Sequence, residues 1–377
     1  MSGVGSVPAI VIDSGSVTCK VGFAGDDAPC AVFPSVVGHL QTPFSSENNA
    51  SKFLVGDQAL SKRAFVSIQN PIHNGVITNW DDMERIWDHA FQNELQVSPK
   101  DFPILLSEPP LNPKKNRERT IQTMFETFNT PSSFLAVGAV LSLLATGTRS
   151  GVVLDSGDTV THAVAIYEGH ALQHAVVQLE YGGQNVAGYI TQSLAQRGYD
   201  LTSPTAQGIV REIKENRGYI AADFEKEVAS YNPPAVRHET SYETSDGRVI
   251  DIQDERFRAP EALFQPSLWG RNDRSVHEAV HDAIVACDAD IRRALWGTIV
   301  LSGGNTMFPG IKDRMLKEIT AISPLNASVN VIAQPERKYA TWLGGSRLAS
   351  MPSFQNNWVF KHEYDELGPN IVHRKCL

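Results

Sequence analysis

The chain contains 377 residues with a mass of 41.3 kDa, which is long for a single hydrophobic core and favours two domains. Hydrophobic residues make up 42% of the sequence and charged residues 20%, a balance that excludes a disordered chain. The net charge of −9 argues against direct binding to nucleic acid or to an anionic membrane surface, because both require a basic contact surface.

The cellular setting follows from the cysteines and the apolar runs. The four cysteines are scattered and form no C-x-x-C pair, so we expect neither a disulfide framework nor a zinc site, and a reducing cytoplasm is the default setting. The N-terminal segment lacks the basic region and cleavage site of a signal peptide. The longest apolar run, 134–145, is too short for insertion into a membrane.

Short aliphatic runs bounded by polar residues or glycine predict buried strands at 9–12, 104–106 and 151–154. Helical patterns lie between these runs, and the first of them, 82–95, places its apolar residues on one stripe. The alternation of strands and helices predicts an α/β fold.

Further along the chain, Asn112 is predicted to cap a helix that begins at Pro113 and carries apolar residues at helical spacing. A longer amphipathic pattern predicts a helix over 275–295. Two polar stretches rich in Ser, Asn and Pro, 39–52 and 230–244, are predicted to be surface loops.

The most informative feature is an internal repeat. The segment AIVIDSGSVTCKVGF, which ends at Phe23, resembles GVVLDSGDTVTHAVAIY, which ends at Tyr167. Each copy has a four-residue apolar strand, then Asp-Ser-Gly, then a second alternating run, so each predicts a β-hairpin with an aspartate at the entry of its turn. The copies lie too far apart for a solenoid repeat, and their spacing suits duplicated domains.

These hairpins have a clear chemical use. A glycine turn exposes backbone N–H groups to phosphate oxygens, and the aspartates Asp13 and Asp155 offer hard oxygens to Mg²⁺ or Ca²⁺. Two such hairpins facing each other across a domain cleft would grip a polyphosphate and its cation. For one copy alone, ordinary turn chemistry is the better interpretation. Because the motif occurs twice, we instead prefer the interpretation as a site for phosphate and a cation.

A third glycine element adds to the pattern. The run 299–306 reads as a strand that enters a Gly-Gly turn at Gly303 and Gly304, and a helical segment, 311–319, follows it. Paired glycines permit close approach of the backbone to a ligand, although such a motif is weak when taken alone.

Long segments of the chain resemble the actin family, and the resemblance covers essentially the whole sequence. The matching segments are GFAGDDAP (22–29), TNWDDME (78–84), MFETFNTP (124–131), PEALFQPS (260–267), PERKY (335–339) and VHRKC (372–376). The resemblance implies the duplicated actin/Hsp70/sugar-kinase ATPase fold, with two α/β domains around a nucleotide cleft and assembly into a two-stranded filament.

The resemblance also implies domain boundaries. The first, outer domain is expected at 1–145 plus 340–377, with a small subdomain at about 35–70. The second, inner domain is expected at 146–339, with a small subdomain at about 182–271.

Site residues carried over from the family form three groups. Asp13 and Asp155 are expected to hold Mg²⁺ or Ca²⁺ through water, and His162 is expected near the γ-phosphate of ATP. The residues expected to contact the phosphates and the nucleoside of ATP or ADP are Gly15, Ser16, Val17, Lys20, Gly157, Asp158, Thr159, Gly183, Arg211, Lys214, Glu215, Gly304, Asn305, Met307, Phe308 and Lys338. Without the resemblance, Lys214 and Glu215 read as solvated helix surface and His162 as an ordinary strand histidine.

Both phosphate turns depart from the family pattern at the same place. Actins usually carry a second glycine in each turn, and here those positions are Val17 and Thr159. If the glycine is needed for a positive φ, a β-branched replacement costs about 1–2 kcal/mol. If it is needed for close approach, the new side chain crowds the phosphate. The sequence leaves both explanations open.

A further departure concerns hydrolysis. The glutamine that orients the attacking water in actins aligns with Gly138, and a glycine has no side chain to hold that water in line. His162 is only a weak substitute. We therefore predict a protein that binds ATP and hydrolyses it slowly, and whether it counts as an enzyme stays open.

Partner surfaces are changed as well. Residues 1–8 contain no acidic residue, whereas actins display an acidic cluster there, so we expect weakened myosin binding. The segment 42–51, which in actins inserts into the neighbouring subunit, is mostly polar, and Arg347 is expected to place a charge in a normally apolar cleft for actin-binding proteins. The loop 268–274 has gained charges, and Asn74 replaces the histidine that usually precedes the glycine of PIHNG.

The leading prediction is an ATP-binding, actin-like cytoskeletal protein of the cytoplasm that forms filaments with itself or joins those of other actins. The alternative is a non-polymerising structural or regulatory actin-related subunit of a larger complex. A sugar kinase needs a cleft aspartate as base beyond the two cation-site residues, and we find none. An Hsp70-type chaperone needs a further peptide-binding domain, for which 377 residues leave no room.

Overall fold

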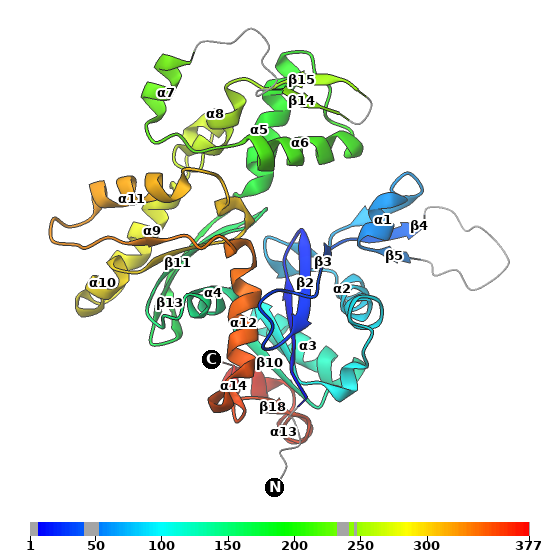
Figure 1. The fold of residues 1–377 in the computed structure, drawn as a ribbon. Coiled ribbons are helices and arrows are strands. Elements are labelled where there is room, and N and C mark those ends of the chain that lie inside the picture. The colour runs from blue at the N-terminus through cyan, green and yellow to red at the C-terminus, as the bar shows by residue number, and fades with distance from the viewer. Residues whose placement is uncertain (1–6, 41–52, 232–240, 245–246, 377) are drawn as a thin grey trace. The chain divides into compact units, whose positions relative to one another are not determined.

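The computed structural model describes residues 7–40, 53–231, 241–244 and 247–376 (Figure 1). The chain forms two compact units. The first comprises Met1–Arg149, Ile166–Gln173 and Tyr339–Leu377, and the second comprises Ser150–Ala165 and His174–Lys338. The altered loop 42–51 and most of the N-terminal tail lie outside the described residues. Within the described part of the chain, no helix is long and apolar enough to cross a membrane.

A six-stranded mixed sheet forms the centre of the first unit, in the order β18-β10-β9-β1-β2-β3. Its central strands β1 and β9 run parallel, and β1 pairs with β2 in antiparallel register. The aliphatic residues of β1 and β9 are buried, as expected for strands covered on both faces. The strands are β1 Ile10–Ser14, β2 Thr18–Phe23, β3 Ala31–Pro34, β9 Ile104–Glu108, β10 Ser132–Val137 and β18 Val359–Phe360.

Helices flank this sheet. The helices of the unit are α2 Trp80–His89, α3 Lys114–Gln122, α4 Gly138–Ala145, α12 Ala340–Ser350, α13 Lys361–Leu367 and α14 Val372–Lys375, with π-helical turns at Ala90–Leu95 and Thr123–Thr127. Gly344 of α12 allows close contact with α4, because a Cβ atom there would lie 1.8 Å from the carbonyl oxygen of Leu141. The indole of Trp342 donates to the carbonyl of Val11 at 3.0 Å, which fixes α12 on the central strand.

Two helix predictions for this unit need adjustment. The segment 82–95 is helical, but it divides into α2 and the π-helical turn after it. The predicted cap at Asn112 is wrong: its side-chain amide donates to Glu108 at 2.9 Å, and α3 begins after Pro113 without a side-chain cap. The Glu108 carboxylate holds this side chain instead.

A small sheet of order β5-β4-β6 also belongs to the first unit. Its elements are β4 Val37–Leu40, β5 Phe53–Val55, α1 Asp57–Ser61 and β6 Val66–Gln69. The predicted loop 39–52 therefore begins inside strand β4. The hairpin of β7 Ile72–His73 and β8 Val76–Ile77 turns at Asn74 and Gly75, with φ of 49° and 78°, as an Asn-Gly hairpin turn requires.

The second unit is built on a five-stranded sheet of order β13-β12-β11-β16-β17. The strands are β11 Gly151–Ser156, β12 Thr161–Tyr167, β13 His170–Leu179, β16 Ile299–Ser302 and β17 Val331–Ile332. The pattern predicted as one helix over 275–295 is two helices, α9 Val276–Val285 and α10 Ala289–Trp296. Helix α11, Ile311–Ile322, follows the Gly-Gly turn as expected.

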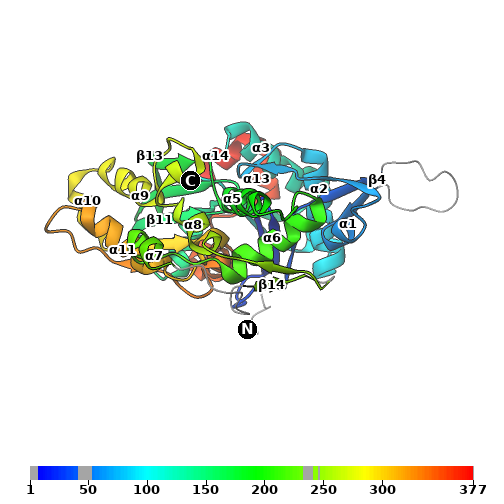
Figure 2. The ribbon, with the colours of Figure 1, turned by 90° about the horizontal axis from the view of Figure 1, so that it is seen from above.

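The remaining elements of this unit form a smaller helical part. They are α5 Gly183–Gln196, α6 Pro204–Arg217, α7 Phe224–Ser230, β14 Ser241–Glu243, β15 Val249–Asp251 and α8 Glu255–Glu261. Helix α5 lies beside α6 and α8 (Figures 1 and 2). Strand β14 occupies part of the predicted loop 230–244.

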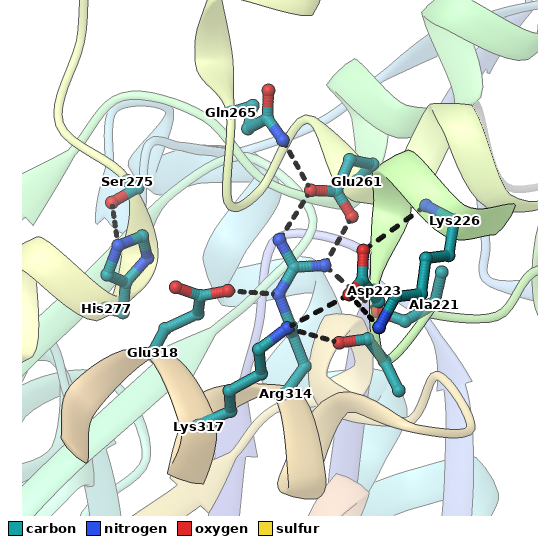
Figure 3. A network of polar contacts seen from close by, with 11 residues as sticks. Ala221, Asp223, Lys226, Glu261, Gln265, Ser275, His277, Arg314, Lys317 and Glu318 are labelled. Atoms are coloured by element: carbon teal, nitrogen blue, oxygen red, sulfur yellow. Dashed lines mark hydrogen bonds and ion pairs between the residues drawn. The ribbon is translucent and has the colours of Figure 1, made fainter. Parts of the chain in front are cut away.

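A buried ion pair joins α8 to α11 (Figure 3). The guanidinium of Arg314 donates to both carboxylate oxygens of Glu261, at 2.7 and 2.9 Å, and to the carbonyl of Ala221 at 2.9 Å. Burial raises the pKa of the Glu261 carboxyl, and Arg314 opposes that shift. Because every strong donor and acceptor of this pair has a partner, the pair fixes the smaller helical part on the sheet layer.

Candidate functional site

The first Asp-Ser-Gly hairpin is formed by β1 and β2 of the first unit. Its turn is closed by a hydrogen bond from the Gly15 N–H to the carbonyl of Thr18 at 3.0 Å. Asp13 lies opposite Lys20 in the register, and the Lys20 ammonium donates to its carboxylate at 2.8 Å. The hydroxyl of Ser107, at the end of β9, donates to the other carboxylate oxygen at 2.6 Å. Asp13 is thus a nearly buried, ion-paired carboxylate at the carboxyl end of a parallel strand.

Two further contacts hold the turn in place. The indole of Trp87 donates to the hydroxyl of Ser14 at 3.3 Å. The N–H of Ser35 donates to the carbonyl of Val17 at 2.8 Å. The residues of the turn itself, 15–17, are half-buried.

The second hairpin, between β11 and β12 of the second unit, repeats the turn. Its closing hydrogen bond runs from the Gly157 N–H to the carbonyl of Val160, again at 3.0 Å. The start of α5 binds this turn through the backbone: Gly183 N–H donates to Gly157 at 3.0 Å and Gln184 N–H to Asp158 at 2.8 Å. A Cβ atom at Gly182 would lie 2.5 Å from the Gly157 carbonyl, so only glycine allows this approach.

Next to this turn lies a small polar cradle around Gly183. A Cβ atom there would meet Lys214 Nζ at 2.8 Å, Asp158 Oδ1 at 3.1 Å and Asn305 Oδ1 at 3.4 Å. Lys214 Nζ donates to the Gly183 carbonyl at 3.1 Å and lies 3.6 Å from Asp158. Burial lowers the pKa of the Lys214 ammonium, and Asp158 opposes the shift.

Asn305 carries an unused acceptor in this cradle. Its amide nitrogen donates to the Ser156 hydroxyl at 2.9 Å, whereas its Oδ1 is buried and has no hydrogen-bond partner among the residues that the structure describes. Gly303, with φ of 88°, brings the end of β16 close to β11, since a Cβ atom there would lie 2.3 Å from the Ser156 carbonyl and 2.8 Å from Asp155 Oδ1. The glycine-rich third element thus sits beside the second hairpin.

The other predicted nucleoside residues differ in exposure. Gly304 starts the short turn Gly304–Thr306, Phe308 is buried, and Met307 is exposed. Arg211, Glu215 and Lys338 are exposed, and within the described residues none of these three side chains forms a hydrogen bond or an ion pair. The structure therefore brings Gly183, Lys214 and Asn305 together around the second turn and leaves these three charged residues at the surface.

Val17 and Thr159 resolve the question about the missing glycines. Among the described residues, a positive φ outside glycine occurs only at Asn74, Gln96, Asn129 and Glu168. Neither turn therefore needs a left-handed residue at the substituted position. The strain explanation is therefore wrong, and the crowding explanation stays a prediction.

His162 is not poised as a charged group. It is buried in β12, and its Nε2 contacts the Gln178 side chain at 3.2 Å. Burial lowers the pKa of its imidazole, although Gln178 opposes the shift, so the ring is neutral at neutral pH.

Gly138 is the first residue of α4 and is buried. A Cβ atom there would lie 3.3 Å from the methyl group of Thr341 and 3.6 Å from the Glu108 carbonyl. The Thr341 hydroxyl is itself bound to Ser142 at 3.0 Å. A Cβ atom at 138 therefore fits if Thr341 shifts by a few tenths of an ångström.

Several residues of these sites are not apparent in the motifs. Ser107 binds Asp13, Trp87 binds Ser14, and Gly182 lets α5 reach the second turn. Ser107 has a signal in hindsight, because polar residues at the carboxyl ends of parallel strands gather at ligand sites. Trp87 lies on the apolar stripe of its helix, so the sequence indicates only a core residue there.

A family model described as Actin matches residues 4–377. The chain belongs to the actin family. The resemblance found in the sequence is confirmed, and so is the fold class, the two-domain actin ATPase fold. Members of this family generally bind ATP or ADP with a divalent cation and associate with other actin subunits. The cradle at Gly183, with its unused buried acceptor, fits a ligand rich in hydrogen-bonding groups.

A separate cavity of about 570 Å³ lies within the first unit. Its walls are mostly apolar and include Val140, Leu144, Leu348 and Met351, and basic residues such as Arg374 border it. Arg347 does not line this cavity. Its guanidinium donates to the carbonyl of Ala145, the last residue of α4, as basic side chains near helix C-termini commonly do. A charge from Arg347 in the family's cleft for actin-binding proteins stays a prediction.

Proposed function

We propose that this actin-family protein binds ATP with Mg²⁺ or Ca²⁺, hydrolyses it slowly, and forms or joins cytoskeletal filaments in the cytoplasm. The first hairpin supplies Asp13 and the turn at Gly15 to Val17, with Lys20 reaching the phosphates. The second supplies Asp155 and the turn at Gly157 to Thr159. When bound, the cation neutralises the phosphate charge and orients the terminal phosphoryl group.

One observation carries the nucleotide proposal: the cradle at Gly183. Three polar atoms of Asp158, Lys214 and Asn305 converge on the space that a side chain would fill, and within the described part of the chain Asn305 Oδ1 has no hydrogen-bond partner. Leaving a buried acceptor unpaired costs about 1–3 kcal/mol, so a donor on a bound nucleoside would recover that energy. The exposed residues Arg211, Glu215, Lys338 and Met307 are proposed to contribute contacts with the bound ligand.

The hydrolysis proposal depends on Gly138 and His162. No side chain at 138 holds a water in line, and His162 is neutral, buried and engaged by Gln178. The chain's own residues therefore bind and neutralise the phosphates but leave the attacking water poorly oriented. Loss of one such orienting contact typically reduces turnover by about 10²-fold or more.

Phosphate release from protein loaded with Mg-ATP tests this proposal. We expect slow release from the wild type and faster release from Gly138→Gln, because the added amide would orient the attacking water. Gly138→Ala is the matched control, because it adds the same Cβ atom but no amide and should stay slow. Wild-type release as fast as that of an ordinary actin filament would contradict the proposal.

Nucleotide content of freshly purified protein tests binding separately. Stoichiometric ATP supports binding with slow hydrolysis, and ADP indicates ordinary hydrolysis. A protein free of nucleotide would overturn the binding proposal. Asn305→Ala should weaken ATP retention without adding any steric conflict, whereas Asn330→Ala, a change at a surface asparagine of the same unit, should not.

The filament proposal has one competing candidate, a non-polymerising subunit of a larger complex. The changed partner surfaces favour altered binding of actin-binding proteins and of myosin. We propose that the cavity beside α4 receives actin-binding proteins of altered selectivity, because a polar residue, Asn357, and basic residues border its apolar walls. The acid-free N-terminus supports weakened myosin binding. Sedimentation after addition of Mg²⁺ and salt decides: regular filaments in the pellet support polymerisation, and a monomer at high concentration supports the alternative.

A further inference from the structure

The hairpin of β7 and β8 carries an Asn-Gly pair in its turn, and the proposed function does not use this pair. The two strands have two residues each and form a two-stranded sheet. Asn74 and Gly75 make the turn, with φ of 49° and 78°, and His73 pairs with Val76 beside it. Small two-stranded hairpins have little stability of their own, so the tip of this hairpin opens at low cost.

The hairpin is anchored at its base. The Pro71 carbonyl accepts hydrogen bonds from the Thr78 N–H at 2.9 Å, from the Thr78 hydroxyl at 3.3 Å and from the Asn79 N–H at 3.3 Å. At the tip, the Asn74 side chain and the Gly75 N–H form no hydrogen bond within the part of the chain that the structure describes. Asn74 is exposed and Gly75 is half-buried. Opening the tip therefore leaves the contacts of the base in place.

The sequence of this turn allows a reaction between its own two residues. The deprotonated amide nitrogen of Gly75 bonds to Cγ of Asn74, and the side-chain amide nitrogen leaves as ammonia. Water then opens the cyclic succinimide at one of its two carbonyls. Cleavage at Cγ gives aspartate, and cleavage at the main-chain carbonyl gives isoaspartate. Glycine favours the first step because it has no Cβ atom beside the attacking nitrogen.

We propose that Asn74 is a site of spontaneous covalent modification, at which the Asn74–Gly75 turn converts to isoaspartate and aspartate. The side chain is exposed, neither reacting group is held by a hydrogen bond within the described residues, and the hairpin is small enough to open at its tip. The reaction consumes water and releases ammonia. It needs no nucleotide and no cation, so it does not depend on the proposed ATP binding.

The two products have different effects on the hairpin. Aspartate keeps the turn, because Asp-Gly suits the same two-residue turn as Asn-Gly. Isoaspartate adds a methylene carbon to the main chain. Because a two-residue turn fixes the register of its strands, this extra carbon breaks the pairing of His73 with Val76. Each product also adds a negative charge to the segment between β6 and α2.

Asn129 provides a matched comparison within the chain. It is also exposed and also has a positive φ, of 51°. The next residue, Thr130, is buried and β-branched, and its N–H donates to the carbonyl of Met124 at 3.1 Å. Exposure and backbone conformation are thus similar at the two asparagines. They differ in the attacking nitrogen, which is hindered and hydrogen-bonded after Asn129.

Peptide mass mapping of aged protein tests the site. The full chain is incubated for weeks at mildly alkaline pH, which promotes loss of the amide proton. We expect deamidation at Asn74 to be about tenfold or more faster than at Asn129, because Thr130 must first give up its hydrogen bond. Labelling with isoaspartyl methyltransferase should mark the Asn74 peptide and not the Asn129 peptide. Equal rates at the two sites, or an unmodified Asn74 in the aged chain, overturn the inference.

The same measurement in urea shows whether the fold protects the turn. Asn74 should react in the native chain at most about tenfold more slowly than in urea, because hairpin tips open at low cost. A native rate below that range would mean that the turn protects Asn74, and would overturn the inference.

Two variants identify the reacting groups. Asn74→Gly keeps a residue that accepts a positive φ and removes the amide, so its peptide should gain no isoaspartate. Gly75→Ala is compared with the wild type in urea, where the strain of alanine at a positive φ plays no part, and should react more slowly. Isoaspartate in the Asn74→Gly peptide, or an unchanged rate for Gly75→Ala, would contradict attack by the Gly75 nitrogen on Asn74.

Discussion

The two Asp-Ser-Gly hairpins have the same turn and different supports. Gly15 and Gly157 each close their turn with a hydrogen bond of 3.0 Å to the residue three positions later. Around the first turn, side chains supply most of the contacts, namely those of Lys20, Ser107 and Trp87. Around the second turn, two backbone hydrogen bonds from the start of α5 are added to side-chain contacts such as that of Asn305 with Ser156.

The electrostatics of the two copies differ at the equivalent position. Lys20 and His162 each lie seven residues after the aspartate of their hairpin. Lys20 is a cation paired with Asp13, whereas burial keeps His162 neutral. The motif thus determines the turn, while residues from elsewhere in the chain determine its charge. Removing a charge should therefore destabilise the first hairpin most, and adding a side chain at a glycine should destabilise the second most.

The largest expected effect is that of Asp13→Asn. It leaves the Lys20 ammonium, which is 11% exposed, without its counter-charge. Removing one partner of a buried ion pair costs about 3–5 kcal/mol, and the retained amide oxygen places the loss at the lower end. Asp158→Asn is the matched change in the second turn and should cost less than Asp13→Asn, because the Lys214 ammonium lies 3.6 Å from Asp158 and keeps its hydrogen bond to the Gly183 carbonyl.

Urea denaturation of the two variants beside the wild type measures this difference. The double variant Asp13→Asn/Lys20→Met removes both charges and should recover part of the lost stability. Equal losses for Asp13→Asn and Asp158→Asn would show that side chains do not support the first turn more than the second.

The next effect concerns bulk in the second hairpin. Gly182→Ala places a methyl group 2.5 Å from the Gly157 carbonyl and should cost about 1–3 kcal/mol, because α5 must move away from the turn. It should also weaken ATP binding, since the Gly183 cradle moves with α5. Gly188→Ala, in the same helix with open space around it, should instead stabilise by up to about 1 kcal/mol. The thermal midpoint and ATP retention are measured for both variants. An unchanged midpoint for Gly182→Ala would contradict the conclusion that close backbone contact with α5 supports the second turn.

The fold can be predicted where the pattern is local. Aliphatic runs locate β1, β9 and β11 because buried strands need consecutive apolar residues. The pattern over 275–295 misses the break between α9 and α10, because apolar spacing continues across the break at Cys287. The sequence neighbours of Asn112 predict a cap, and the competing carboxylate of Glu108 reaches it only in the folded chain. The predicted domain boundaries stay predictions.

The candidate site can be predicted where residues repeat. The duplicated aspartates and glycines are sufficient to locate both turns in the sequence. Ser107, Trp87 and Gly182 cannot be found in this way, because each acts through a contact with a residue far away in sequence. Conversely, the exposed Arg211, Glu215 and Lys338 follow from the family resemblance alone, and their proposed role needs a ligand to test it.

A smaller effect is the pH dependence of stability that we expect from His162, which occupies the position of Lys20 in the second hairpin. The pKa of His162 lies below its ordinary 6.5 in the folded chain, so the unfolded chain takes up a proton that the folded chain does not. Stability should therefore fall as pH drops through about 6.5, by at most about 1.4 kcal/mol per pH unit for this one group. His162→Gln should reduce the slope but not abolish it, because burial also lowers the pKa of His277. Urea midpoints between about pH 7.5 and 5.5 measure the slope, and an unchanged slope would show that His162 is protonated in the fold.

The smallest effect is expected at the two positions where the turns depart from the family. Neither Val17 nor Thr159 has a positive φ, so restoring glycine relieves no strain and adds backbone freedom to the unfolded chain. Val17→Gly and Thr159→Gly should each lower stability by about 0.5–1 kcal/mol. If the side chains crowd the phosphates, the same variants should nevertheless bind ATP more tightly, so stability and affinity should move in opposite directions. A gain in stability would mean that strain is present after all. Unchanged affinity would mean that neither side chain reaches the ligand, and the two hairpins would then differ only in how they are supported.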